Sequence, residues 1–378
     1  MDRVCDVSQF SSAMNLQKAL RSTQHPAAGT SVSELEFGPD ELGEGFGYHY
    51  VEMGEDPDRE APVRFTLVRF QPAQDASGVE LSQAEFSSRP AILLVHGMTD
   101  YFFQRHVAEY FTDLGYAVYG IDLRKCGRSW REGQTWHHVS KQRIYGEDLT
   151  IAAALITNAH PSLTVFGHSN GGLGVTMWAS RLHHDAVDMP ESPQATLFSR
   201  LDAVVLNSPW FGLQFNAMTR ILINKVIPVV SHFRPNLQLK GGVNPINGVT
   251  LHTSEKGEWD YNLELKPVQA RPKSITWLTG VATEIRNLQT GNYSTGLPTL
   301  LLCSDKHYFG RAVDERAYTS DVILKPSQMR EQARNADPNT DVAVIKDGLH
   351  DIFLSRLPVR NEALAVTSDW LAHNRLNR

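Results

Sequence analysis

The sequence predicts an α/β protein with a mostly parallel sheet of eight strands, helices on both faces and an inserted helical cap. Three observations support this class. Short apolar runs rich in β-branched residues alternate along the chain with helical patterns, as in βαβ units. The run Pro90–His96 is continuously apolar, which indicates a strand buried on both faces. One long interval, residues 211–297, lacks this alternation and therefore indicates an insertion.

The expected strands begin as an antiparallel pair and continue as parallel strands. Tyr48–Met53 and Val63–Phe70 alternate between apolar and polar residues, as antiparallel strands do. Further strands are predicted at 90–96, 117–121, 163–166, 203–206, 299–303 and 342–345. Helices are predicted at 104–114, 144–158, 173–182, 327–335 and 362–374. These elements occupy residues 46–378, and we expect residues 1–45 to form an N-terminal extension with a short helix over 8–20.

Residues 211–297 separate two consecutive strands by too long a stretch for a simple crossover. The interval contains an apolar helical pattern over Met218–Val230, broken at Pro228, and a second helical pattern over Ile275–Leu288. We expect this interval to form a helical cap over the carboxyl edge of the sheet. A separate domain is the alternative, although the interval offers little apolar sequence for a core of its own.

Composition and charge argue against several classes of protein. The net charge is −6, and no cluster of Lys and Arg suggests a nucleic-acid partner. The three cysteines, Cys5, Cys126 and Cys303, are too few and too far apart for a metal site or a disulfide framework, which favours a reducing compartment. No apolar leader or segment of membrane-spanning length is visible, so we expect a cytoplasmic protein without stable membrane insertion.

The motif Gly167–Gly171, with the sequence Gly-His-Ser-Asn-Gly, directly follows a predicted strand and precedes a helical pattern. A Gly-x-Ser-x-Gly motif in this setting is typical of a nucleophile elbow, where a strained turn exposes the serine hydroxyl. Glycines at both ends let the strand and the helix approach each other. The helix N-terminus also stabilises negative charge that develops beside the serine. We therefore predict Ser169 as a nucleophile, with a chance Gly/Ser turn as the alternative.

A serine hydroxyl needs a base, which in turn needs a carboxylate to orient it. In a sheet of this type the acid and the histidine follow the serine along the chain, each in a loop after a strand. His350 lies in the loop after the last predicted strand, and we predict it as the base. Asp305 directly follows a strand, whereas Asp321 ends an excursion over 306–320; we favour Asp321 as the acid and keep Asp305 as the alternative.

An acyl-transfer site also needs hydrogen-bond donors for the oxyanion. The turn after His96-Gly97 offers the backbone N–H of Met98, and the residue after the nucleophile offers that of Asn170. The paired histidines His137-His138 have no metal-ligand partners in the sequence, and we expect them at the surface. Neither a metal nor an organic cofactor is predicted.

Taken together, four segments resemble the α/β-hydrolase superfamily, and in particular the branch of monoacylglycerol lipases, lysophospholipases and S33-type aminopeptidases. They are His96–Asp100, Asp122–Ser129, Gly167–Gly172 and Gly348–Asp351. The resemblance implies the α/β-hydrolase fold, Ser169 as nucleophile, His350 as base, and Met98 and Asn170 as oxyanion donors. The sequence departs from the family pattern at Lys125-Cys126, where the family usually has Gly-His, and in the insertion before Asp321, which leaves the acid open.

These features predict a serine hydrolase that cleaves carboxylic esters through an acyl-enzyme. The apolar stretch 221–230 suggests a lipophilic acyl chain, as in a monoacylglycerol or a lysophospholipid, although packing of the cap on the sheet explains it equally well. A thioesterase, a cofactor-free perhydrolase and an aminopeptidase are alternatives on the same residues; an aminopeptidase would use Glu258 and Asp260 for the substrate amine. A non-catalytic ligand-binding protein of the same fold is a further alternative.

Overall fold

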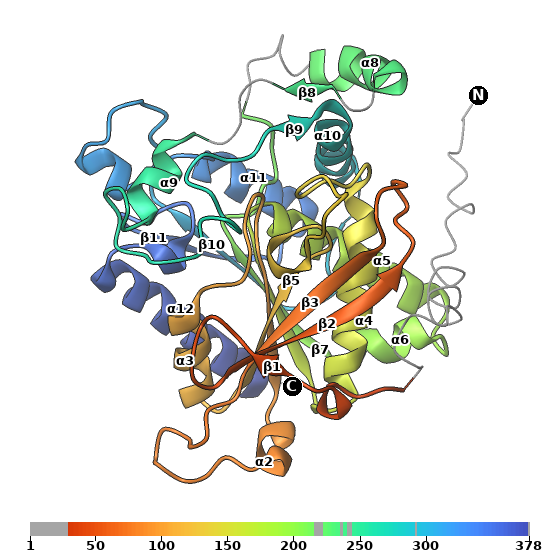
Figure 1. Cartoon of the computed structure of the whole chain (residues 1–378), viewed down its shortest axis with the longest axis vertical. Helices are drawn as coiled ribbons and strands as arrows, with labels where there is room; N and C mark the ends of the chain where they lie inside the picture. The colour runs from red at the N-terminus through yellow and green to blue at the C-terminus, as the bar shows by residue number, and fades with distance from the viewer. Residues whose placement is uncertain (1–28, 215–221, 235–236, 240–243, 292, 377–378) are drawn as a thin grey trace.

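A nine-stranded sheet runs through the centre of the computed structural model, with helices on both faces (Figure 1). The structure describes residues 29–214, 222–234, 237–239, 244–291 and 293–376, so the helix expected over 8–20 lies outside the described residues. The strands of the sheet are β1 (Gly38–Pro39), β2 (Phe46–Gly54), β3 (Val63–Phe70), β4 (Ala91–Val95), β5 (Ala117–Asp122), β6 (Leu163–His168), β7 (Leu201–Asn207), β10 (Thr299–Ser304) and β11 (Asp341–Ile345). The predicted α/β class is confirmed.

The strand order is β1-β2-β3-β5-β4-β6-β7-β10-β11. Strands β1, β2 and β3 pair antiparallel, and β3 pairs antiparallel with β5, whereas all strands from β5 to β11 pair in parallel. The sheet has nine strands rather than the predicted eight because β1 adds two residues at one edge, where Gly38 pairs with Tyr48 and Pro39 with Gly47. A strand of two residues produces no periodic pattern, and it lies in the stretch expected to be an extension.

The helices cover the two faces unequally. On one face lie α3 (Arg105–Asp113) and α12 (Leu357–Leu376); on the other lie α4 (Tyr145–Thr157), α5 (Asn170–Asp188), α6 (Pro193–Phe198), α10 (Ile275–Thr290) and α11 (Pro326–Ala336). Strand β4 shows how the core divides, since successive side chains of a strand point to opposite faces. Ile92 packs in the apolar cluster with α3 and α12, whereas Leu93 and Val95 pack in the cluster with α4 and α5.

Several short elements lie between β7 and β10, in the interval expected to form the cap. They are a π-helical turn (Leu222–Val226), α8 (Ile227–Phe233), β8 (Gln238–Leu239), α9 (Ile246–Leu251), β9 (Lys273–Ser274) and the long α10. Strands β8 and β9 form a separate antiparallel pair. Figure 1 shows α8, β8, β9 and α10 together at one end of the molecule.

The first helical pattern of this interval differs from the expectation. Residues 218–221 of the pattern lie outside the described residues. Pro228 was expected to break the helix, but it lies in the first turn of α8, where proline is favoured because its missing N–H would have no helical partner. Ile223 is buried in the main apolar cluster, which also contains Trp277, whereas Val229 and Phe233 are exposed. Among the described residues, no helix is both long and apolar enough to span a membrane.

Candidate active site

Ser169 lies at the junction of β6 and α5 in a strained backbone conformation. Its φ of 51° and ψ of −117° fall outside the regions that L-residues normally occupy. The surrounding chain permits this turn only with glycine at the flanking positions: a Cβ on Gly171 would lie 2.2 Å from the carbonyl oxygen of His96, and one on Gly167 would lie 2.8 Å from the Cα of Gly172. The strand, tight turn and helix predicted from the motif are therefore present.

The structure brings Ser169, His350 and Asp321 together in one chain of hydrogen bonds. The Oγ of Ser169 lies 2.9 Å from Nε2 of His350, and Nδ1 of His350 lies 2.9 Å from Oδ2 of Asp321. Because the carboxylate accepts, Nδ1 carries the proton and Nε2 is free to accept from the serine hydroxyl. His350 lies in the loop after β11, and all three side chains are buried.

Asp321 is held from its other side by the backbone. Its Oδ1 accepts hydrogen bonds of 2.8 Å from the N–H groups of both Ile323 and Leu324, and its side chain is fully buried. The excursion over 306–320 closes beneath it, because the N–H of Asp321 donates to the carbonyl of Lys306 and the N–H of Tyr308 donates back to the carbonyl of Asp321. The excursion thus returns Asp321 to the sheet edge next to His350.

Asp305, the alternative acid, has a different place. Its Oδ1 accepts a 2.9 Å hydrogen bond from the N–H of Asp347, and its Oδ2 lies 3.7 Å from Nζ of Lys306. Lys306 also forms an ion pair with the Asp347 carboxylate. Asp305 therefore fastens the start of the loop that carries His350 and makes no contact with the imidazole.

The two expected oxyanion donors flank the serine. Asn170 is the first residue of α5, and a Cβ placed on Gly97 would lie 3.1 Å from the Cβ of Ser169, so the turn that presents Met98 lies against the nucleophile. Within the described part of the chain, no hydrogen bond uses the backbone N–H of Met98 or of Asn170. Both donors are therefore available for a ligand oxygen.

A buried ion pair, which the sequence did not indicate, connects the turn after β4 to the inserted interval. Nζ of Lys266 lies 2.7 Å from Oδ1 of Asp100, and it also lies 4.7 Å from the ring centroid of Phe103. Burial alone would raise the pKa of Asp100, but the Lys266 ammonium, together with His168 and His96, lowers it. The carboxylate is thus charged, and the pair connects the turn after β4 to the segment before α10.

His137 and His138 were expected at the surface, but both are buried. They lie in the loop before the 3₁₀ turn Gln142–Ile144, which packs against α5 and α10. Nδ1 of His138 lies 3.2 Å from Oγ of Ser274, just before α10. The expectation was wrong because the inserted interval covers this loop, and a pattern within one segment does not show what packs on it from elsewhere in the chain.

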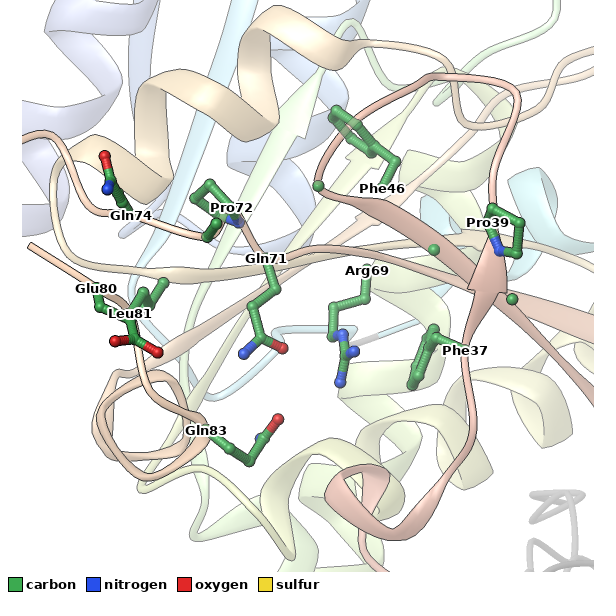
Figure 2. A pocket seen from close by; sticks show the side chains of 14 residues that line it. Phe37, Pro39, Phe46, Arg69, Gln71, Pro72, Gln74, Glu80, Leu81 and Gln83 are labelled. Carbon is green, nitrogen blue, oxygen red and sulfur yellow. The ribbon is translucent and has the colours of Figure 1, made fainter. Parts of the chain in front are cut away.

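One groove of the structure lies away from these residues. It has a volume of about 800 Å³ and is lined by side chains from β1 to β3 and the start of α2 (Gln83–Ser88), among them Phe37, Arg69 and Gln71 (Figure 2). None of the residues around Ser169 contributes to it, so we do not place the chemistry there. No group of three or more His, Cys, Asp or Glu residues able to hold a metal occurs among the residues that the structure describes.

Solved structures with the same fold include lipases and an esterase. A soluble variant of the monoglyceride lipase from Saccharomyces cerevisiae, in complex with a substrate analog, is 16% identical with a TM-score of 0.57, over 86% of this chain and 96% of that one. The monoacylglycerol lipase of Paleococcus ferrophilus is 17% identical with a TM-score of 0.56, over 76% and 96%. A thermophilic esterase from Thermogutta terrifontis is 16% identical with a TM-score of 0.52, over 86% and 99%.

At these identities the likeness establishes a common fold and leaves the substrate open. No curated protein shows significant sequence similarity to the chain. The profile of the family described as "Serine aminopeptidase, S33" matches residues 87–355, which include Ser169, Asp321 and His350. This match covers most of the chain, and the sheet order and the elbow agree with it. The protein therefore belongs to the serine aminopeptidase S33 family of α/β-hydrolases.

Proposed function

We propose that this protein is a serine hydrolase that cleaves carboxylic esters through an acyl-enzyme, with Ser169, His350 and Asp321 as its catalytic triad. The observation that carries the proposal is the continuous hydrogen-bonded chain from the serine hydroxyl through the imidazole to a fully buried carboxylate. A strained serine with an adjacent oriented base is the arrangement that activates a hydroxyl for attack on a carbonyl.

In the proposed reaction, Nε2 of His350 accepts the proton of Ser169 as the hydroxyl attacks the ester carbonyl. The oxygen of the tetrahedral intermediate accepts hydrogen bonds from the N–H groups of Met98 and Asn170. The imidazolium, stabilised by Asp321, then gives its proton to the leaving alcohol. Water attacks the acyl-enzyme by the same sequence and releases the acid. None of these steps uses a metal or an organic cofactor.

We also propose that residues 211–297 cover the site as a cap. Two contacts to the turn after β4 support this: the Lys266–Asp100 ion pair, and the 2.9 Å hydrogen bond from the N–H of Asn262 to the hydroxyl of Tyr101. A cap over the serine suits a lipophilic acyl ester such as a monoacylglycerol or a lysophospholipid. Ile223 does not support that choice, since it packs into the core rather than lining a groove.

The S33 description raises an aminopeptidase as the alternative, for which Glu258 and Asp260 were the expected ligands of a substrate amine. The side chain of Asp260 is 92% exposed, and that of Glu258 lies 3.7 Å from Nη1 of Arg360. Neither forms an enclosed acidic site, so esters remain the favoured substrates. Cys126 and Cys303 are buried free thiols, in keeping with the proposed cytoplasmic location.

Labelling with a fluorophosphonate probe, combined with hydrolysis of 4-nitrophenyl esters, tests the proposal. We expect one covalent adduct on Ser169, and we expect Ser169→Ala to abolish labelling and to lower kcat/KM by about 10⁶-fold. Ser180→Ala is the matched control, because Ser180 is a buried serine of the same helix α5 outside the site. An unlabelled wild-type protein, or a Ser169→Ala variant that still hydrolyses the esters, would contradict the proposal.

A further inference from the structure

Six side chains, from the turn after β4, residues 137–142, the start of α5 and the segment before α10, bury polar atoms that have no hydrogen-bond partner among the described residues. They are Oγ1 of Thr99, both ring nitrogens of His137, Nε2 of Gln142, Oδ1 of Asn170, Nε of Arg271 and Nζ of Lys273. We call these six residues the polar cluster. Folded proteins pair nearly all of their buried polar groups, because an unpaired one loses its hydration without compensation. Unpaired buried donors, above all the Lys273 ammonium, are what a site for a polar ligand provides.

Two series of contacts connect this cluster to the nucleophile. In the first, Asn170 directly follows Ser169, and its Nδ2 donates a buried 3.0 Å hydrogen bond to Oε1 of Gln142. In the second, Nζ of Lys273 lies 5.7 Å from the ring centroid of Trp277, whose ring is 6.1 Å from that of Trp210. The backbone N–H of Trp210 in turn donates a 3.0 Å hydrogen bond to the carbonyl oxygen of Ser169. These contacts lead from Gln142, Asn170 and Lys273 to the proposed active site.

The cluster is also positively charged without a balancing carboxylate. Lys273 is 7% exposed, and among the described residues neither it nor Arg271 forms an ion pair with an acidic group. The segments of the chain interior that the structure does not describe, 215–221, 235–236, 240–243 and 292, contain no Asp or Glu. Arg271 lies over the ring of Trp136 at 4.3 Å, and its Nη2 donates only to the backbone carbonyl of Glu264.

The electrostatic surroundings of Lys273 agree with this picture. The pKa of Lys273 is lowered to about 7, chiefly by burial; the Cys126 thiol raises it and the positive charge of Arg271 contributes to the lowering. Burial, Lys273, His96 and Arg271 together hold the pKa of His137 well below its usual range. The groups that face the ammonium are thus cationic or neutral, and a negative charge placed among them would relieve both the desolvation and the repulsion.

Other buried cations of the same chain, unlike Lys273, form ion pairs with carboxylates. Arg124 lies 2.6 Å from Asp148, Lys125 lies 2.5 Å from Asp56, and Lys266 lies 2.7 Å from Asp100. Each of these cations is paired within the fold, as buried charges normally are. Lys273 departs from this rule, and a bound substrate can supply the missing anion.

We propose, on the basis of the ester hydrolase activity proposed above, that the polar cluster binds an anionic group of the substrate. The substrate is then a lipophilic ester that carries a phosphate or a carboxylate, rather than a neutral acylglycerol. Lysine supplies a point charge for such a group, arginine supplies a planar fork, and the Gln142 amide supplies a further donor. The anion occupies the Lys273 side of the site while Ser169 attacks the ester carbonyl.

Matched pairs of esters test this substrate class. Lauroyl glycerol is compared with lauroyl glycerol 3-phosphate, which places a phosphate on the alcohol side. 4-Nitrophenyl butyrate is compared with the 4-nitrophenyl half ester of glutarate, which places a carboxylate on the acyl side. We expect kcat/KM to favour the anionic member of at least one pair by tenfold or more, and the preferred pair identifies both the anion and the side of the ester that carries it.

Substitution then assigns the preference to the cluster. Lys273→Met should reduce the ratio of anionic to neutral kcat/KM to near one, whereas Lys225→Met, at an exposed position of the same inserted interval, should leave the ratio unchanged. A wild-type enzyme that hydrolyses both members of both pairs equally would overturn the proposal, and so would a preference that survives Lys273→Met. Either result leaves the ester hydrolase assignment intact, whereas failure to hydrolyse any ester contradicts that assignment instead.

A binding measurement does not depend on turnover. Calorimetry of Ser169→Ala with decyl phosphate, decanoate and decanol should show binding of an anionic amphiphile at least tenfold tighter than that of decanol. At pH 8.5 the anion should bind with uptake of close to one proton, because it raises the pKa of a lysine that is mostly neutral there. Repeating the titration in buffers of different ionisation enthalpy measures this uptake. Equal affinities for all three compounds, or an uptake that persists in the Ser169→Ala/Lys273→Met double variant, would contradict the proposal.

Discussion

Two groups of buried polar side chains, the proposed triad and the polar cluster, differ in how their hydrogen bonds are satisfied. In the first group, both ring nitrogens of His350 and both oxygens of Asp321 have partners within the protein. In the second, the polar cluster around Lys273, buried donors and acceptors have none. The first arrangement is complete before any ligand arrives, as expected of groups that must hold one proton in a fixed place. The second has the properties of a ligand site, where unpaired groups provide the affinity.

In the hydrogen-bonded group, replacing the proposed acid Asp321 should give the largest loss of activity. Asp321→Asn leaves the volume unchanged but removes the charge that orients and stabilises the protonated imidazole, so kcat should fall by about 10⁴-fold. Steady-state hydrolysis of a 4-nitrophenyl ester measures the loss. Asp305→Asn is the control, because Asp305 binds the backbone of Asp347 instead of His350, and its effect should be far smaller. If Asp305→Asn proved the more damaging change, the assignment of Asp321 would be wrong.

Two ion-paired lysines that differ in burial, Lys266 and Lys306, sharpen the comparison through stability. Lys266→Met leaves the Asp100 carboxylate buried without its partner, which should lower the free energy of unfolding by about 3–5 kcal/mol. Urea unfolding at pH 7 measures the change. Lys306→Met removes an ion pair at a half-exposed position and should change stability by less than about 1 kcal/mol. Equal losses in the free energy of unfolding from the two substitutions would show that the Lys266–Asp100 pair does not stabilise the turn after β4.

The unpaired lysine should have a pH signature of its own. The pKa of Lys273 is about 7 in the folded protein and about 10.4 when unfolded, so between these values the unfolded chain binds more protons. The stability of the wild type should therefore rise relative to Lys273→Met by about 1.4 kcal/mol per pH unit from pH 7 to pH 10, with no relative slope below pH 7. The thiol of Cys126 and the imidazole of His137 are present in both proteins and largely cancel in this difference. Parallel stability curves across this range would show that Lys273 is not desolvated.

Much of the fold could be predicted from the sequence because most strands and helices have a local sequence pattern. The strand expected at 117–121 is β5, Ala117–Asp122, and the helix expected at 327–335 is α11, Pro326–Ala336, since buried runs and a proline at a helix start are local features. Strand β1 escaped prediction because two residues produce no period. Pro228 was misinterpreted because proline both begins and interrupts helices.

The candidate site also contains features that a local motif predicts and features that depend on contacts between distant segments. The elbow is a contiguous motif, so its own neighbours were enough to select Ser169 as the proposed nucleophile. The choice between Asp321 and Asp305 depended on whether residues 306–320 return to the sheet edge, which is decided by hydrogen bonds between Lys306, Tyr308 and Asp321. The burial of Lys273 and His137 depends on contacts between segments far apart in the chain, and no local pattern reports such burial. An unpaired buried charge such as that of Lys273 therefore cannot be predicted from the sequence alone.

The excursion that carries Asp321 has a consequence for protein engineering. Ala317 and Val322, within and just after it, share a small apolar cluster with Ile246 of α9, in the inserted interval. Deleting that interval to obtain a smaller protein would uncover Val322, the residue next to the proposed acid Asp321. A minimal version of this protein would therefore have to retain α9 or rebuild its apolar contact, even for substrates that need no cover.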